Sequence, residues 1–351
     1  MAKSASVTDM SAFAGVAEPL FHGGDLGAAQ RLFPGAPEPF IDLSTGINPN
    51  PYRLRRLPTK LLAQLPDSQA VSALAEIAAR AYGAPSPAHV VPAPGTQILL
   101  PLVAALARPG RAAIFPPTYS EFARAAALAG HSVLQARDLA ATDAVQLVLI
   151  GNPNNPDGRL SARGDLLALA ERLRRRGGVL VVDEAFMDVG PADESLAADV
   201  SCGNIVVLRS FGKFFGLAGL RLGFALAAPA MGTRIAARLG PWAISGPALT
   251  AGAKALADTA WMEKTRNRLA KAAIRLDGVL AGAGLTIVGG TSLFRLASTP
   301  AANTLFNHLG RAGIFARAFP DHAEWLRFGL PADESAWQRL QTALAAFHRS
   351  G

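Results

Sequence analysis

The chain has 351 residues, of which 50% are hydrophobic and 17% charged, and its formal net charge is +8. This composition excludes a disordered chain, and the length suffices for one large α/β domain and a smaller one. The longest apolar run, Leu99–Ala107, is about half of the ~18 residues that a membrane span requires. Residues 1–15 contain no signal-peptide apolar region. We therefore expect a cytoplasmic protein with no membrane partner.

The basic side chains are dispersed along the chain, except for one dense run that contains Arg172, Arg174, Arg175 and Arg176. We place this run at the C-terminal end of a helix, where cations face the helix dipole favourably, and so expect no nucleic-acid partner. The positive charge instead favours anionic metabolites such as phosphorylated compounds. Because Cys202 is the only cysteine, the sequence predicts no internal disulfide and no metal site, and we expect Cys202 to be buried.

The chain divides into three regions by its pattern of residues. Residues 1–40 contain several Gly and Pro residues and no sustained period, which predicts an N-terminal arm. Residues 41–245 form the predicted large domain, because short β-branched runs alternate there with Ala- and Leu-rich stretches, the pattern of a mainly parallel sheet covered by helices. Residues 246–351 form the predicted smaller C-terminal α+β domain. The strands that we assign are 112–115, 147–150, 179–182 and 205–208 in the large domain, and 285–288 and 292–296 in the small domain.

Lys213 follows the last of the large-domain strands and lies among apolar and glycine residues. In open parallel sheets, ligands bind at these strand ends. A lysine held among apolar groups has a lowered pKa, which an amine needs to form a Schiff base with an aldehyde. An isolated Gly-Lys pair is more often an ordinary loop lysine. Here Ser210 and Arg221 bracket the lysine, and a hydroxyl and a guanidinium together can bind a phosphate.

Polar residues also follow the preceding strands. Asp183 ends an apolar strand, where a buried carboxylate requires a cationic partner such as a protonated pyridine nitrogen; the alternative is an Asp that caps a turn. Asn155 lies in a Pro-rich turn after residue 150, where its amide can donate to a phenolic oxygen. Gly95, Thr96 and Gln97 precede a helical stretch that we start at Ile98, so the amides of Thr96 and Gln97 can bind a phosphate.

In chain order these motifs are a phosphate turn, an aromatic residue, an asparagine, an aspartate, a lysine and an arginine. The set resembles the pyridoxal-phosphate (PLP) dependent enzymes of fold type I, the aspartate-aminotransferase fold. The resemblance implies catalytic roles for Lys213, which would hold PLP, and for Asp183, and it implies a homodimer. Tyr119 would stack on the cofactor ring, with a core tyrosine at a helix start as the alternative. The implied cofactor-binding residues are Gly95, Thr96, Gln97, Tyr119, Asn155, Asp183, Ser210, Lys213 and Arg221.

Two groups of this class compete as the nearest resemblance, the histidinol-phosphate aminotransferases and the threonine-phosphate decarboxylases of cobalamin biosynthesis. The sequence is more similar to the decarboxylases at four segments, His22–Gly24, Asp42–Pro49, Asp183–Phe186 and Pro241–Ser245. Phe186 stands where aminotransferases usually have a Tyr that bonds the cofactor. The resemblance implies decarboxylation of L-threonine O-3-phosphate to (R)-1-amino-2-propanol phosphate, with histidinol-phosphate transamination as the alternative. A non-catalytic sensor or scaffold is disfavoured by the complete cofactor set.

The resemblance to the decarboxylases also implies a substrate site. Arg327 would hold the substrate carboxylate and Arg317 its phosphate, since guanidinium geometry suits both groups; surface ion pairs are the alternative. The implied substrate-facing residues are His22, Gly23, Gly46, Asn155, Arg317 and Arg327.

Three positions depart from the pattern of these relatives. Gly46 stands where the relatives have Asn, so any contact there would come from the backbone. Asp157 replaces the usual Thr of the Asn-Pro-Thr-Gly turn, and we expect this change to be neutral because Asp also favours turns. Leu65 stands where many relatives have a Tyr that reaches the neighbouring subunit's cofactor phosphate, so we expect that contact to be lost or replaced.

Overall fold

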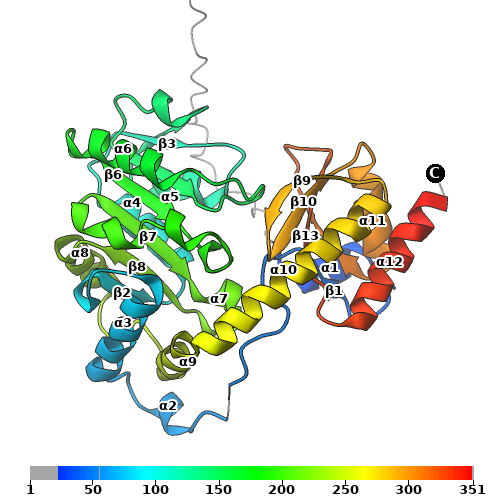
Figure 1. Ribbon diagram of the computed structural model, residues 1–351, viewed down its shortest axis with the longest axis horizontal. Helices are drawn as coiled ribbons and strands as arrows, with labels where there is room; N and C mark the ends of the chain where they lie inside the picture. The colour runs from blue at the N-terminus through cyan, green and yellow to red at the C-terminus, as the bar shows by residue number, and fades with distance from the viewer. Residues whose placement is uncertain (1–22, 55, 350–351) are drawn as a thin grey trace, which may run out of the picture.

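The structure is a computed structural model that describes residues 23–54 and 56–349. Figure 1 shows two domains, a large one coloured cyan to green and a smaller one coloured mainly orange to red. The long helix α10 (Thr259–Gly282) connects the large domain to the small one. Among the described residues, no helix is both long and apolar enough to cross a membrane.

A seven-stranded sheet of order β2-β8-β7-β6-β5-β3-β4 forms the centre of the large domain. β8 is antiparallel to both of its neighbours, whereas the remaining pairs are parallel, which confirms the predicted mainly parallel sheet. The predicted strands fall in β3, β5, β6 and β7, within two residues at each end. The strands are β2 (Val90–Ala93), β3 (Arg111–Ile114), β4 (Ser132–Gln135), β5 (Leu147–Gly151), β6 (Val179–Asp183), β7 (Ile205–Ser210) and β8 (Gly223–Ala227).

The central strands are buried on both faces because their residues alternate between two apolar clusters. In β5, for example, Val148 packs in one cluster while Leu147 and Leu149 pack in the other. Helices cover the sheet, as expected for a parallel sheet that is apolar throughout. The helices of this domain are α2 (Lys60–Ala63), α3 (Ser68–Tyr82), α4 (Thr96–Ala104), α5 (Glu121–Leu128), α6 (Arg163–Arg174), α7 (Phe211–Phe214), α8 (Pro229–Leu239) and α9 (Gly246–Ala257).

The small domain contains an antiparallel sheet of order β12-β13-β10-β9. The two predicted strands start one or two residues too early. Leu285 still belongs to the turn that ends α10, since its N–H donates to Leu280 O, and Ser292 lies in the turn between the strands. The elements are β9 (Thr286–Thr291), β10 (Phe294–Ser298), α11 (Ala302–Arg311), β11 (Ile314–Phe315), β12 (Arg317–Ala318), β13 (Trp325–Gly329) and α12 (Glu334–Arg349).

The N-terminal segment packs on the small domain. Residues 26–32 form a helix, α1 (Leu26–Leu32), whose N-terminus is capped by the Asp25 side chain. Next, β1 (Ile41–Asp42) pairs in parallel with β11. The predicted boundary between residues 40 and 41 therefore does not separate an arm from the large domain in space, because both α1 and β1 lie with the small domain (Figure 1).

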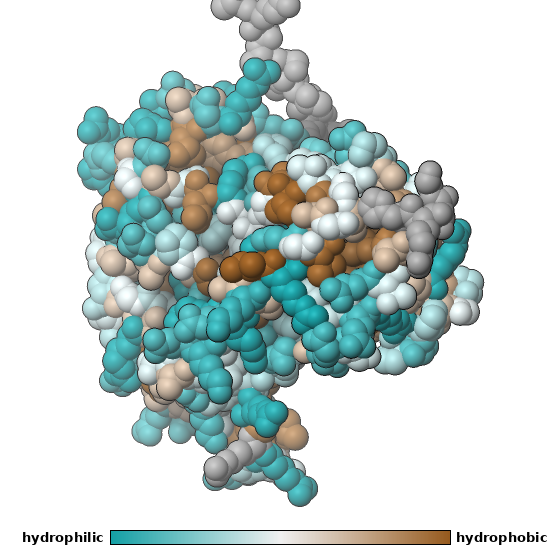
Figure 2. Space-filling view, turned by 45° about the vertical axis from the view of Figure 1, so that its right-hand side comes forward, coloured by the Kyte–Doolittle hydropathy of each residue, from teal (hydrophilic) through white to brown (hydrophobic). Residues whose placement is uncertain are grey.

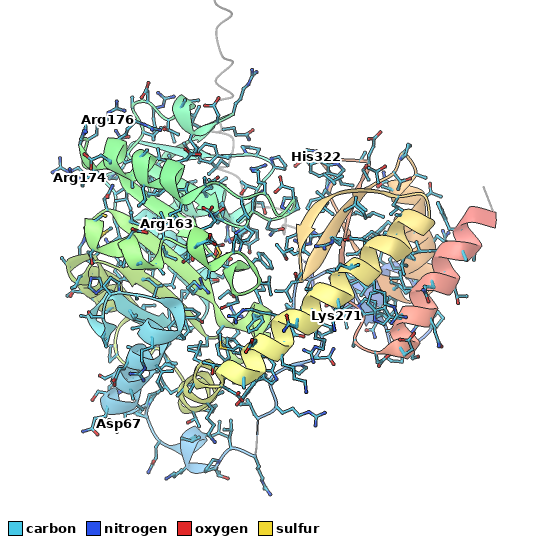
Figure 3. All side chains as sticks on the ribbon, in the orientation of Figure 1. Asp67, Arg163, Arg174, Arg176, Lys271 and His322 are labelled. Carbon is cyan, nitrogen blue, oxygen red and sulfur yellow. The ribbon has the colours of Figure 1, made fainter. Side chains whose placement is uncertain are left out.

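The arginine run lies at the end of α6, as predicted; Arg172 donates to Leu139 O, and the other three members pair with nearby acidic residues. Arg174 and Arg175 pair with Glu171 at 2.8 and 3.0 Å, and Arg176 pairs with Asp143 at 3.5 Å. Figure 3 shows Arg174 and Arg176 at the outer edge of the large domain. The expected burial of Cys202 was wrong: the residue is exposed, because it ends a short surface turn directly before the left-handed Gly203.

Candidate active site

Loops at one edge of the large sheet bring the predicted cofactor residues together. Gly151 of β5 lies opposite Asp183 of β6, and Ser210 of β7 lies opposite Gly223 of β8. Gly223 in turn lies opposite Ala93, two residues before Gly95. Strand register therefore places four segments that are distant in sequence around one site.

Lys213 lies in the short helix α7, which directly follows β7. The turn is fixed by Asn48, whose N–H donates to Lys213 O at 2.9 Å and whose Nδ2 donates to Phe214 O at 2.9 Å. Lys213 Nζ lies 5.9 Å from the centroid of the Phe186 ring. Burial and, to a smaller extent, the charge of Arg327 lower the pKa of Lys213 to about 8, against the opposing effect of Asp183. The amine is thus far more often neutral near pH 8 than a solvated lysine, as a nucleophile requires.

Asp183 ends β6 with its side chain at the same edge. Burial raises the pKa of Asp183 to about 6, although the N–H of Ala185, at 3.2 Å, and the charge of Lys213 both lower it. A further cation beside this carboxylate would favour its ionised form. The protonated pyridine nitrogen of PLP is a cation of this kind, so Asp183 fits the predicted role.

A phosphate-binding arrangement lies at the start of α4. The helix begins at Thr96, after Gly95 in a left-handed conformation (φ 90°), and no described side chain caps it. The guanidinium of Arg221 lies against Gly95, since a Cβ added there would be 2.7 Å from Arg221 Nη2. Ser210 lies at the neighbouring strand end. A free helix N-terminus, a guanidinium and a hydroxyl form a donor set that fits the phosphate of PLP.

Tyr119 is held in place by a chain of hydrogen bonds that the sequence did not predict. Its hydroxyl donates to Gln97 Oε1 at 2.9 Å, and Gln97 Nε2 donates to Glu121 Oε2 at 2.5 Å. Burial raises the pKa of Tyr119, so its hydroxyl stays protonated as a donor. Gln97 thus contributes its side chain as well as its backbone. There was little reason in the sequence to assign Glu121 to this site, because its one recognisable feature is an acidic side chain in the first turn of α5.

The two predicted substrate arginines lie directly opposite each other on neighbouring strands, Arg317 on β12 and Arg327 on β13. Arg327 is 8% exposed, and its guanidinium donates to Ser44 O at 2.8 Å and to Asn155 Oδ1. Burial and, to a smaller extent, the charge of Arg317 together lower the pKa of Arg327 to about 10. Two neighbouring cations in a partly buried place repel each other, so an anionic ligand between them would offset this repulsion.

The remaining predicted substrate residues surround Arg327. Asn155 accepts from Arg327 through Oδ1, which leaves its Nδ2 as a donor for a ligand. Gly46 is buried, and a Cβ there would lie 2.8 Å from the Phe294 ring and 2.9 Å from the Phe186 ring. The aromatic packing therefore requires glycine at this position. Gly23 lies against Ser44, whereas His22 lies outside the described residues.

Asp157 does more than favour a turn. Its carboxylate accepts from Asn154 Nδ2 at 2.7 Å and from Arg159 Nη1 at 2.8 Å. Arg159 also donates to Pro117 O at 3.1 Å, in the loop that leads to Tyr119. Asp157 therefore links the Asn155 turn to the Tyr119 loop.

Leu65, the third position that departs from the pattern of the relatives, is 69% exposed.

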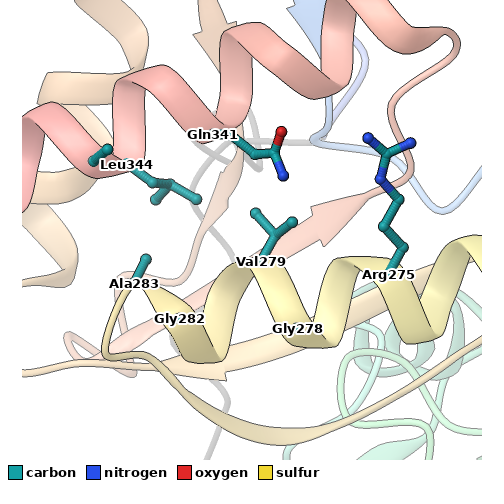
Figure 4. Close-up of a pocket in the computed structure, with 8 residues that line it drawn as sticks. Arg275, Gly278, Val279, Gly282, Ala283, Gln341 and Leu344 are labelled. Carbon is teal, nitrogen blue, oxygen red and sulfur yellow. The ribbon is translucent and has the colours of Figure 1, made fainter.

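A separate hollow lies in the small domain, between α10 and α12, and is lined by Arg275, Gly278, Val279, Gly282, Ala283, Gln341, Leu344 and Ala345 (Figure 4). Arg275 already forms two hydrogen bonds to Glu334. Nothing in this lining supplies the amine and carboxylate found at the strand ends. Over residues 23–54 and 56–349, no group of three or more His, Cys, Asp or Glu side chains could hold a metal ion.

Comparisons with known proteins show the family of this chain. The family model "Aminotransferase class I and II" matches residues 45–344. Threonine-phosphate decarboxylase from Sinorhizobium sp. is 44% identical over 333 residues, which cover 93% of this chain and 98% of the relative. The enzyme of the same name from Pseudomonas aeruginosa is 41% identical, with the same 93% and 98% covered. Histidinol-phosphate aminotransferase Rv2231c from Mycobacterium tuberculosis is 35% identical, with 69% of each chain covered.

A solved structure supports the fold. Histidinol-phosphate aminotransferase from Sinorhizobium meliloti, crystallised with pyridoxal-5'-phosphate, superposes with a TM-score of 0.78 over 98% of this chain and 100% of that chain, at 23% identity. The predicted fold type is thereby confirmed. On the match over residues 45–344, the chain belongs to the class I and II aminotransferase family.

Proposed function

We propose that this protein uses PLP to decarboxylate L-threonine O-3-phosphate, yielding (R)-1-amino-2-propanol phosphate for cobalamin biosynthesis. The relatives named threonine-phosphate decarboxylase match nearly the whole chain, whereas the named aminotransferase matches 69% of it. The observation that carries the proposal is the opposed pair of Arg317 and Arg327. Residues directly opposite in an antiparallel pair have Cβ atoms about 4.5–5.5 Å apart. Such a pair suits a small ligand with two anionic groups.

A phosphorylated amino acid provides those two groups. Its phosphate carries a charge of about −1.5 to −2 near pH 7, and its carboxylate carries another negative charge. Arg327 would bind the carboxylate, because it is already oriented by Ser44 O and Asn155 Oδ1. Arg317 would then bind the phosphate, Tyr119 would stack on the cofactor ring, and Asn155, which accepts from Arg327, would lie near both the cofactor and the substrate.

Lys213, Asp183, Arg221, Ser210 and the N-terminus of α4 would hold PLP. The bound cofactor supplies an electron sink for the pair of electrons released at the substrate Cα. Asp183 would keep the ring nitrogen protonated, which strengthens that sink. Once CO₂ has left, the ammonium form of Lys213 would deliver a proton to Cα and become the neutral amine, a role that its lowered pKa suits.

The choice between decarboxylation and transamination depends on which Cα bond stands perpendicular to the cofactor ring. Arg327 and the N-terminal segment would fix the carboxylate in that position. Phe186 places an apolar ring 5.9 Å from Lys213 Nζ, without the hydroxyl that aminotransferases usually have there. Figure 2 shows apolar residues, in brown, on the side of the molecule turned toward the viewer, near the place where the two domains meet.

The test is incubation of the PLP-loaded protein with L-threonine O-3-phosphate, with and without 2-oxoglutarate, followed by assay of CO₂ and of oxo acid. We expect stoichiometric CO₂ in both samples and no requirement for 2-oxoglutarate. Formation of glutamate from 2-oxoglutarate and histidinol phosphate at comparable efficiency would contradict the proposal and favour an aminotransferase.

The proposal includes a cytoplasmic homodimer. In Figure 1, α2 projects from the large domain. Leu62 in α2, Leu65 shortly after it, and Trp242 are 76%, 69% and 61% exposed. Burial of these apolar side chains against a second copy would remove them from water. Sedimentation equilibrium of the purified protein should give twice the monomer mass, and replacement of Leu62 and Leu65 by Lys should shift it toward the monomer.

A further inference from the structure

Ser44 connects two parts of the candidate substrate site that are distant in sequence. It is fully buried, and its carbonyl accepts from Arg327 Nη2 at 2.8 Å. Its hydroxyl accepts from the N–H of Gly24 at 2.8 Å, on the segment that follows residue 22. One residue therefore contacts both the arginine and the N-terminal segment.

Asp42 fixes the orientation of Ser44. Its Oδ1 accepts from Ser44 Oγ at 2.6 Å and from the Ser44 N–H at 2.8 Å. Since the hydroxyl proton is donated to Asp42, the oxygen of Ser44 is left to accept from Gly24. Asp42 itself lies in β1, held by its pairing with Phe315. Its negative charge also favours the protonated form of Arg327, although burial has a larger and opposite effect on the pKa of that arginine.

The N-terminal segment fits closely on this pair. A Cβ added at Gly23 would lie 2.3 Å from Ser44 O, the same oxygen that accepts from Arg327. Gly24 has a φ of 93°, in the left-handed region that favours glycine. Any side chain at residue 23 would thus displace either the segment or the carbonyl that orients the arginine.

We propose that Asp42 and Ser44 are positioning residues that hold the backbone of Gly23 and Gly24 and the side chain of Arg327 in a fixed relation. In this way they set the affinity of the site for the substrate carboxylate. This inference rests on the proposed function, because it requires Arg327 to bind that carboxylate. Neither residue needs to touch the substrate. Their effect should therefore be specific to ligands with a carboxylate.

The experiment uses two probes that share a phosphate and lack an amine, so that neither can react with the cofactor: 3-phosphoglycerate, which has a carboxylate, and glycerol 3-phosphate, which has none. Isothermal titration calorimetry on the PLP-loaded protein gives a Kd for each. We expect wild type to prefer 3-phosphoglycerate. Ser44→Ala removes the hydrogen bonds of the hydroxyl with Asp42 and Gly24, so it should weaken 3-phosphoglycerate binding about tenfold and change glycerol 3-phosphate binding little.

Two further variants disturb the contacts of Ser44 and Arg327 in other ways. They serve in place of Ser44→Ala if that variant does not fold. Gly23→Ala keeps the side chains of Ser44 and Arg327 but displaces either the Gly23–Gly24 backbone or the Ser44 carbonyl, and should give the same selective loss. Asp42→Asn keeps an Oδ1 acceptor but removes the charge, so it should lose less than Ser44→Ala. The matched control is Ser72→Ala, an exposed helix serine whose hydroxyl donates only to Ser68 O among described groups, and which should bind both probes as wild type does.

Arg327→Ala separates this inference from the proposed function. If Arg327→Ala abolishes the preference for 3-phosphoglycerate while Ser44→Ala and Gly23→Ala both retain it, the positioning role is wrong and the proposed role of Arg327 stands. If Arg327→Ala retains the preference, the proposed role of Arg327 is itself wrong. Equal loss of both probes in folded Ser44→Ala, judged by an unchanged circular dichroism spectrum, would also overturn the inference.

Discussion

The cofactor end and the substrate end of this site are assembled in different ways. The residues that would hold PLP lie on successive loops at one edge of a single sheet, so the register of β5, β6, β7 and β8 brings them together. The substrate end joins segments from opposite parts of the chain, as in the hydrogen bond between Arg327 and Ser44, which are 283 positions apart. We infer that the cofactor end depends on strand order and the substrate end on packing between the N-terminal segment and the small domain.

The largest effect should come from the centre of the cofactor end. Lys213→Ala should abolish both catalysis and the visible absorption band of bound PLP, because no other described lysine lies at these strand ends. The absorption spectrum after reconstitution and dialysis checks this, and Lys254→Ala on α9 is a matched control. A wild-type protein whose borohydride-reduced cofactor is attached to a different lysine would contradict the assignment.

The next largest effect concerns Asp183. Asp183→Ala removes the carboxylate that would keep the cofactor ring protonated, so we expect kcat to fall by several orders of magnitude. PLP should remain bound through its phosphate, since the α4 N-terminus and Arg221 are unchanged. Stopped-flow or steady-state kinetics together with cofactor titration measure both quantities. Near-normal turnover in Asp183→Ala would mean that another acid pairs with the ring.

A smaller effect should appear in the pH dependence of PLP capture by the apoprotein. Only the neutral amine of Lys213 attacks an aldehyde, and burial lowers its pKa to about 8. Below this pKa the neutral fraction falls about tenfold for each pH unit, and above it the fraction levels off. The capture rate should therefore rise up to about pH 8 to 9 and then flatten. A rate that keeps rising to pH 10 would show that the lysine is not perturbed.

The smallest effect should come from Asp157, which links the Asn155 turn to the Tyr119 loop. Asp157→Ala removes an acceptor from the buried Asn154 and a partner from Arg159. We expect the free energy of unfolding to fall by about 1–3 kcal/mol and activity to fall a few-fold. Asp157→Thr, which restores the residue usual in relatives, should lose less than the Ala variant. Urea denaturation and kcat/KM measure these changes, and an Ala variant equal to wild type would make the link dispensable.

The comparison between the two ends also explains what the sequence could and could not predict. Asp183 and Lys213 lie at the ends of recognisable strands, and Arg221 follows Lys213 in the same glycine-rich segment, so their convergence was predictable from strand order. The bonds of Asp157 with Arg159 and of Gln97 with Glu121 depend on side-chain directions that no local pattern specifies. The helix α1 was read as part of an arm because its seven residues are too few for a clear period. β8 was not assigned because its run Gly223–Ala227 contains no β-branched residue.

The most direct test of the proposed substrate end compares Arg317→Ala and Arg327→Ala with L-threonine O-3-phosphate and with unphosphorylated L-threonine. Loss of a buried charge partner costs about 2–5 kcal/mol, or roughly 30-fold to several thousand-fold in kcat/KM. Arg317→Ala should show this loss with the phosphorylated substrate and little loss with threonine, already a poor substrate, whereas Arg327→Ala should impair both. If Arg317→Ala reduces kcat/KM equally with the two substrates, then Arg317 does not bind the phosphate, and the opposed arginines do not divide the two anionic groups between them.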